Sequence, residues 1–207
     1  NATGVDHLAM ALQDKGIVLI HISTDYVFDG QNSRPYKTTD LTRPLNVYGR
    51  SKLKGEKYIE QRLSKYFIIR TSWLYSPYGH NFVKTVARRV KNGAKMTIDS
   101  SQTGSPTSAY DLADFVNYLI AGEIENYGVY HFTASDHATW FELAMFVARH
   151  YSEKPESLIS STARYETKAE RPKYSVLDLQ KTLKIYEDIP SWKVSVSTVI
   201  GKMNTMV

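Results

Sequence analysis

The chain has 207 residues, of which 42% are hydrophobic and 23% are charged, a composition typical of a globular protein that buries a substantial core. It has no cysteine, which excludes a disulfide framework, and no apolar run long enough to span a bilayer, so a cytosolic location is expected. The formal charge of +5 could indicate nucleic-acid binding, but lysines and arginines are scattered along the chain, and a small anionic ligand explains the same charge.

The beginning of the chain predicts a helix, a strand and a polar turn. The apolar run 17–22 reads as a strand buried on both faces, and it continues into the polar residues 23–26. Ligands bind beyond the carboxyl ends of parallel strands, where the Thr24 hydroxyl can hydrogen-bond a carbonyl oxygen. Residues 1–13 predict the helix, with one apolar side formed by Val5, Leu8, Ala9 and Leu12.

A polar loop over 29–43 leads to a second predicted helix, which begins at Pro44. Tyr48 and Lys52 lie one turn apart on it and can point at the same small molecule. At about 6 Å and an effective dielectric of about 20, an ammonium stabilises a phenolate by roughly 3 kcal/mol, or about two pKa units. The pair can therefore serve as a proton donor, although a single Tyr-x-x-x-Lys is also common in ordinary amphipathic helices.

Residues 66–70 predict the next buried strand, which ends in polar residues and then Trp73. Trp73 can belong to the core or contact a ligand, and its place at a strand end favours the ligand. Asn81 can cap a helix over 82–92 that Gly93 ends, and it can also contact a ligand.

The second half of the chain alternates short strands and polar connections with helices. Ser108-x-x-Asp111 and Thr139-x-x-Glu142 have the spacing of capping boxes, the first with aspartate in place of glutamate. The predicted elements are strands at 96–98 and 127–133 and helices at 112–120, 143–150 and 192–203.

Six motifs are distributed over nearly the whole chain. They are Ser23-Thr24-Asp25-Tyr26-Val27-Phe28-Asp29-Gly30, Pro44-Leu45-Asn46-Val47-Tyr48-Gly49-x-Ser51-Lys52-x-x-Gly55-Glu56, Arg70-Thr71-Ser72-Trp73-Leu74-Tyr75, Asn81-Phe82, Gln102-x-Gly104-x-Pro106-Thr107 and Arg171-Pro172-x-x-Ser175-Val176-Leu177-Asp178. Together they resemble the dTDP-4-dehydrorhamnose reductases, which are extended short-chain dehydrogenases/reductases that make dTDP-L-rhamnose for cell-wall polysaccharide.

This resemblance implies a reaction and residue roles. NADPH or NADH would deliver hydride to the C4 ketone of dTDP-4-dehydro-L-rhamnose, and Tyr48 would give a proton to the carbonyl oxygen that Thr24 orients. Lys52 would lower the pKa of Tyr48 and hydrogen-bond the nicotinamide ribose. Arg171 would pair with the diphosphate, or would only begin a strand. The implied cofactor contacts are Ser23, Tyr48 and Lys52, and the implied substrate contacts are Thr24, Asp25, Tyr26, Trp73, Asn81, Gln102 and Arg171.

The implied fold is α/β, a Rossmann-like doubly wound parallel sheet with a smaller C-terminal substrate lobe. Residues 1–98 would be the C-terminal part of the NAD(P)-binding Rossmann domain. Residues 99–207 would mainly form the lobe, interleaved with Rossmann elements around 108–150, and the lobe would draw on 99–107 and most of 153–177.

Family members begin with a strand and a glycine-rich turn that holds the cofactor pyrophosphate. None of the eleven glycines here falls in a Gly-x-x-Gly-x-x-Gly or Gly-x-Gly-x-x-Gly arrangement. We therefore expect about 80 residues, the size of a mononucleotide-binding half, to be absent from the front of this sequence. Such a fragment alone would bind a dinucleotide poorly.

The alternative function is that of a non-catalytic binding protein similar to the regulatory beta subunit of methionine adenosyltransferase, which keeps a similar turn and Tyr/Lys pair. Arg70-Thr71-Ser72-Trp73 favours the reductase. The sequence leaves open NADPH against NADH, a nucleotide other than dTDP, a homodimer, and the Mg²⁺ that accompanies dimerisation in some family members. Zinc is not expected, because the six histidines show no His-x-x-x-His spacing.

Overall fold

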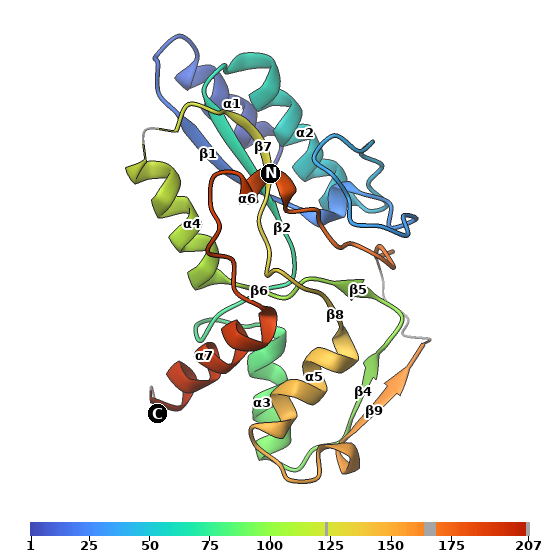
Figure 1. Cartoon of the computed structure of the whole chain (residues 1–207). Coiled ribbons are helices and arrows are strands. Elements are labelled where there is room, and N and C mark those ends of the chain that lie inside the picture. Colours follow the sequence, from blue (N-terminus) through green and yellow to red (C-terminus); the bar gives the residue numbers. More distant parts are fainter. Residues whose placement is uncertain (123, 164–168, 206–207) are drawn as a thin grey trace.

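The computed structural model describes residues 1–122, 124–163 and 169–205. The molecule is elongated, with two groups of elements stacked along its length (Figure 1). We call the upper group, α1, α2, α4, β1, β2 and β7, the sheet core, and the lower group, α3, α5, α7, β4 and β9, the helical core. No helix in the described part of the chain combines the length and the apolar character needed to cross a membrane.

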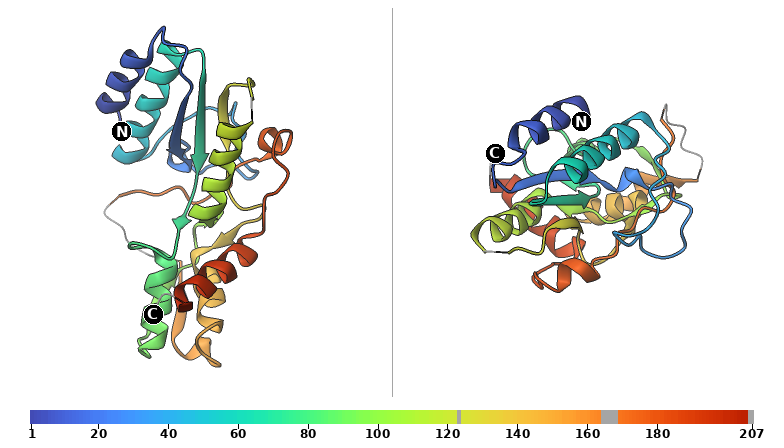
Figure 2. Two further views of the ribbon diagram at one scale, coloured as in Figure 1. Left: turned by 90° about the vertical axis from the view of Figure 1, so that its left-hand side faces the viewer. Right: turned by 90° about the horizontal axis from the view of Figure 1, so that it is seen from above.

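The sheet core is a parallel three-stranded sheet in the order β1-β2-β7, with helices on both faces (Figure 2). Side chains of the central strand alternate between the faces, as in any strand. Ile68 packs with α1 and α2, whereas Phe67 and Ile69 pack against α4. This arrangement confirms the predicted doubly wound α/β fold. The elements are α1 (Thr3–Leu12), β1 (Leu19–Thr24), α2 (Val47–Arg62), β2 (Tyr66–Thr71), α4 (Ala109–Ala121) and β7 (Gly128–His131).

Helix α2 begins three residues later than predicted from Pro44. Asn46 is its N-cap, and the side-chain oxygen of Asn46 accepts a hydrogen bond of 2.9 Å from the backbone N–H of Gly49. A Cβ atom at Gly49 would overlap the carbonyl oxygen of Tyr26. Glycine at this position therefore lets the first turn of α2 lie directly against the turn that follows β1.

Two burial predictions for the first elements are wrong. The first four residues of β1 are only partly buried, because β1 is one of the two outer strands of the sheet in the described residues. Leu8 is 46% exposed, because the side of α1 that packs on α2 runs through Val5, Ala9 and Leu12.

The helical core packs three helices with a pair of parallel strands, and its caps were largely predictable. Asn81 caps α3, and Thr139 and Glu142 form the predicted capping box at the start of α5. In α4 of the sheet core, Asp111 does not complete the box predicted at Ser108; its carboxylate accepts a hydrogen bond from Ser195 of α7 instead. The elements are α3 (Phe82–Lys91), β4 (Met96–Asp99), α5 (Trp140–Arg149), β9 (Ile159–Thr162) and α7 (Trp192–Thr205).

Short strand pairs lie between the two cores (Figure 1). The pair β3–β6 is parallel and the pair β5–β8 is antiparallel. The remaining short elements are β3 (Leu74–Tyr75), β5 (Thr103–Gly104), β6 (Thr107–Ser108), β8 (Ala138–Thr139), the 3₁₀ turns η1 (Asp25–Val27) and η2 (Pro155–Ser157), and α6 (Gln180–Leu183).

The two cores do not follow the order of the chain, because each contains elements from both halves of the sequence. Helix α3 and strand β4, which ends at Asp99, pack in the helical core with α5 and α7, while α4 and β7 return to the sheet core. The segment 153–177, predicted for the substrate lobe, includes residues 164–168, which lie outside the described residues. The division into a cofactor domain and a substrate lobe stays a prediction.

Candidate functional site

A pocket of about 520 Å³, which we call the central pocket, opens at the carboxyl ends of β1 and β2. This is the edge at which an open parallel sheet binds ligands. Eight of the residues singled out in the sequence line it: Ser23, Thr24, Asp25, Tyr26, Tyr48, Lys52, Trp73 and Arg171.

Tyr48 and Lys52 reach the central pocket from neighbouring turns of α2. The Tyr48 side chain is open to the pocket, with 48% of the residue exposed, and its ring meets that of Tyr26 edge to face at 6.0 Å between centroids. Lys52 is buried, and its Nζ donates a 2.5 Å hydrogen bond to the carbonyl oxygen of Ile22. Burial lowers the pKa of Lys52, an effect that the charge of Glu56 opposes. An ammonium has three donors, so Lys52 keeps others for a ligand.

Thr24 and Asp25 share a hydrogen bond at the floor of the pocket. The Thr24 hydroxyl donates to Oδ1 of Asp25 at 3.0 Å and accepts from the backbone N–H of Tyr26 at 3.2 Å. Burial raises the pKa of Asp25 to about 6, although the nearby hydroxyls of Ser175 and Thr24 favour the charged form. The Thr24 hydroxyl is thus in place for a carbonyl ligand, and the Asp25 carboxylate competes for its proton.

Behind the pocket, a buried ion pair ties α2 to the sheet. Glu56 on α2 pairs with Arg70 on β2 at 2.7 Å between Oε2 and Nη2, and both side chains are buried. The Ser23 hydroxyl donates to the same carboxylate. Ser23 therefore lines the pocket with its hydroxyl already engaged.

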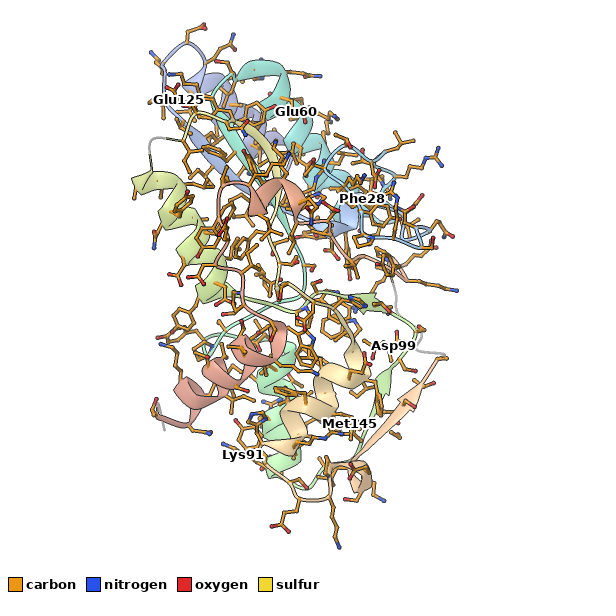
Figure 3. The ribbon with its side chains drawn as sticks, in the orientation of Figure 1. Phe28, Glu60, Lys91, Asp99, Glu125 and Met145 are labelled. Atoms are coloured by element: carbon orange, nitrogen blue, oxygen red, sulfur yellow. The ribbon has the colours of Figure 1, made fainter. Side chains whose placement is uncertain are left out.

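A second pocket of about 360 Å³, which we call the side pocket, shares Trp140 and Arg171 with the central pocket. Gln102 lines the side pocket together with Asp99, and its Nε2 donates to Oδ2 of Asp99 at 2.5 Å. Asp99 lies at the end of β4 in the lower half of Figure 3. Gln102 therefore lines a pocket that adjoins the one lined by the catalytic candidates, and Arg171 lines both.

Asn81 lies apart from both pockets. Its Oδ1 accepts from the backbone N–H of Lys84 at 3.1 Å, and its Nδ2 donates to the carbonyl oxygen of Ser76 at 2.7 Å. The structure therefore shows the capping role of Asn81, and its contact with substrate stays a prediction.

Sequence reasoning missed Trp140, the first residue of α5. Its indole stacks on that of Trp73 with 3.7 Å between ring centroids and 10° between the planes. The available signal was a tryptophan directly after the capping Thr139. Its stacking partner, Trp73, lies far away in the chain, so the sequence alone did not reveal the contact.

Metal ligation finds no support in the described residues, because no group of three or more histidine, aspartate or glutamate side chains is placed to hold an ion. The suggested Mg²⁺ thus has no ligand set in this part of the chain.

The chain matches a known protein family over nearly its whole length. The family described as RmlD substrate binding domain matches residues 1–205. A dTDP-4-dehydrorhamnose reductase of Aggregatibacter actinomycetemcomitans is 39% identical, over 96% of this chain and 71% of its own length. That of Escherichia coli K12 is 36% identical, over 99% and 72%.

Solved structures agree with these relatives. A dTDP-4-dehydrorhamnose reductase from Clostridium acetobutylicum has a TM-score of 0.89 and 34% identity, over 99% of this chain and 72% of that one. One from Bacillus anthracis, in complex with NADP, has a TM-score of 0.87 and 36% identity, over 98% and 72%.

Proposed function

This chain belongs to the family of the RmlD substrate binding domain, and we propose that it reduces the C4 ketone of dTDP-4-dehydro-L-rhamnose to dTDP-L-rhamnose with NADPH. The observation that carries the proposal is the central pocket, in which Tyr48, Lys52 and Thr24 meet at the carboxyl edge of the parallel sheet. Relatives named for this reaction, alike over nearly the whole chain, support the choice of substrate.

The central pocket suits the nicotinamide end of the cofactor. Lys52 lies at its wall with donors left over from the bond to Ile22, and these match the hydroxyls of a ribose. The nicotinamide supplies the hydride that adds to the ketone carbon. NADPH is preferred over NADH in this proposal because the Bacillus anthracis relative is in complex with NADP.

The residues of the chain supply binding, orientation and the proton. The Tyr48 phenol, open to the pocket, donates its proton to the ketone oxygen as negative charge develops there. The positive charge of Lys52, one turn along α2, stabilises the phenolate that remains. The Thr24 hydroxyl donates a hydrogen bond to the same ketone oxygen, which fixes the carbonyl in the pocket.

The two adjoining pockets fit the two ends of a nucleotide sugar. The Arg171 guanidinium is exposed where the pockets meet, and it can bind the diphosphate through two parallel hydrogen bonds. The sugar then lies in the central pocket and the base in the side pocket, beside Gln102. In this arrangement the sheet core holds the cofactor and the helical core holds the nucleotide.

An absorbance assay tests the proposal on the full-length protein. Mixing it with NADPH and dTDP-4-dehydro-L-rhamnose should consume NADPH and yield dTDP-L-rhamnose in equal amounts. A protein that acts only as a regulatory subunit would leave NADPH unchanged, and that result would reject the reductase assignment. The names of the relatives do not favour that alternative.

A further inference from the structure

Trp73 is held in an unusual backbone conformation at the edge of the central pocket. Its φ angle is +47°, in the left-handed region that side chains rarely adopt. Such a conformation persists only where the surroundings fix it, and such sites cluster at ligand-binding positions. The backbone on either side is anchored, since the Ser72 hydroxyl donates to the carbonyl oxygen of Ser105 at 2.7 Å and Thr107 N–H donates to that of Trp73 at 3.3 Å.

Two residues, Trp140 and Gly104, contact the Trp73 indole, and both lie at the paired strands β5 and β8. Trp140 stacks on the indole with 3.7 Å between ring centroids, and Phe82 packs edge-on against Trp140 with 4.7 Å between centroids. Gly104 is buried beside the same indole, and a Cβ atom there would lie 2.6 Å from Cε2 of Trp73. Gly104 pairs with Ala138 in the antiparallel strands β5 and β8, so this pairing brings Gly104 and Trp140 to the same place.

The stacked indoles form one wall of the central pocket. Trp73 and Trp140 both line the pocket that contains Tyr48, Lys52 and Thr24, and Trp140 also lines the side pocket. A flat, rigid aromatic surface binds the apolar face of a sugar ring and fixes its orientation without losing side-chain freedom. Small displacements of such a surface misalign the reacting carbonyl.

We propose that Trp140 and Gly104 are positioning residues that hold Trp73 as a rigid wall against which the sugar ring of the substrate is aligned for reduction. The identity of the ligand rests on the proposed function. The positioning itself is a property of the folded chain and can be measured without substrate.

The first test follows the indole N–H signals by ¹H–¹⁵N NMR. The chain has three tryptophans, and the indole N–H of Trp192 donates to the carbonyl oxygen of His137, so its signal reports on the backbone beside β8. Trp140→Phe and Gly104→Ala should each move the Trp73 signal, because the first changes the ring current and the second displaces the indole. Gly201→Ala is the matched control, since nothing lies within 4 Å of a Cβ atom there. An unmoved Trp73 signal in both site variants would overturn the proposal.

The second test is kinetic and uses the full-length protein. Gly104→Ala and Trp140→Leu should lower kcat/KM for the nucleotide sugar by about 10- to 100-fold, with the dissociation constant of NADPH unchanged. Trp140→Phe retains an aromatic stack and should recover most of the loss. Kinetics at the wild-type level in Gly104→Ala, in a protein whose Trp73 signal has moved, would overturn the positioning role.

The two tests separate this inference from the proposed function. Absence of reductase activity in the wild-type protein would reject the function, whereas the NMR result would still decide whether Trp140 and Gly104 fix Trp73. Well-dispersed spectra of Gly104→Ala and Trp140→Phe would show that these variants fold. The kinetics of Trp140→Leu are compared with those of these two folded variants.

Discussion

Asp25 is a carboxyl group buried at the floor of the central pocket. Burial raises its pKa from 3.8 to about 6. Because the pKa in the folded protein exceeds that in the unfolded chain, the folded state is destabilised as the pH rises from about 4 to about 6. A pKa difference of about 2 corresponds to about 3 kcal/mol.

We therefore expect the free energy of unfolding of Asp25→Asn, relative to that of wild type, to rise by up to about 3 kcal/mol as the pH goes from 4 to 7. The reason is that the amide of the variant never ionises, whereas the wild-type carboxyl does. Urea unfolding at a series of pH values measures this. Asp114→Asn, an exposed aspartate on α4, is the control and should track wild type. A stability difference between Asp25→Asn and wild type that is the same at both pH values would contradict the account.

At the scale of residues, the sequence predicted which side chains share a helix face better than it predicted contacts between distant segments. Tyr48 and Lys52 were predictable because helical spacing alone places them on one face. Trp140 was not, because its stacking on Trp73 joins segments that are far apart in the chain, beside the pairing of β5 with β8. The engagement of Ser23 by Glu56 is likewise a tertiary contact.

Among the elements, α2 carries the proposed catalytic pair Tyr48 and Lys52, and the Glu56–Arg70 ion pair links α2 to the sheet. Removing one partner leaves the other charge buried and uncompensated, so we expect Glu56→Gln to lower the free energy of unfolding by about 3–5 kcal/mol. Chemical unfolding measures the loss.

The same helix offers a control, the exposed ion pair between Lys57 and Glu60, the latter labelled in Figure 3. Glu60→Gln should cost less than about 1 kcal/mol. Equal losses for Glu56→Gln and Glu60→Gln would show that the buried pair does not anchor the helix.

Helices were predicted where a local signal marks their start, as at Asn81 and Thr139. The start of α2 was placed too early because Pro44 suits a first turn, whereas the Asn46 side chain caps the helix. The two-residue strands β3, β5, β6 and β8 have no local pattern, and they arise only because distant segments meet between the two cores.

For the whole molecule, the proposed function requires a nucleotide diphosphate to bind across the junction of the two pockets, beside Arg171. A ligand that binds only the folded state raises stability by about 2.7 kcal/mol at 100 times its dissociation constant. We expect dTDP to raise the Tm of the protein and to do so less for Arg171→Ala, measured by thermal unfolding at one dTDP concentration.

Arg43→Ala, at an exposed arginine outside both pockets, is the matched control for that experiment and should respond to dTDP as wild type does. An equal rise in Tm for Arg171→Ala and wild type would remove Arg171 from the diphosphate site.

In the proposed reaction, the Tyr48 phenol protonates the ketone oxygen. The most direct measurement compares steady-state kinetics of Tyr48→Phe and Tyr58→Phe in the full-length protein, since both tyrosines lie on α2 and only Tyr48 lines the central pocket. We expect Tyr48→Phe to lower kcat by about 10²- to 10⁴-fold with a modest change in KM for the nucleotide sugar, and Tyr58→Phe to leave kcat near wild type. Turnover by Tyr48→Phe close to that of the wild-type protein would contradict the account.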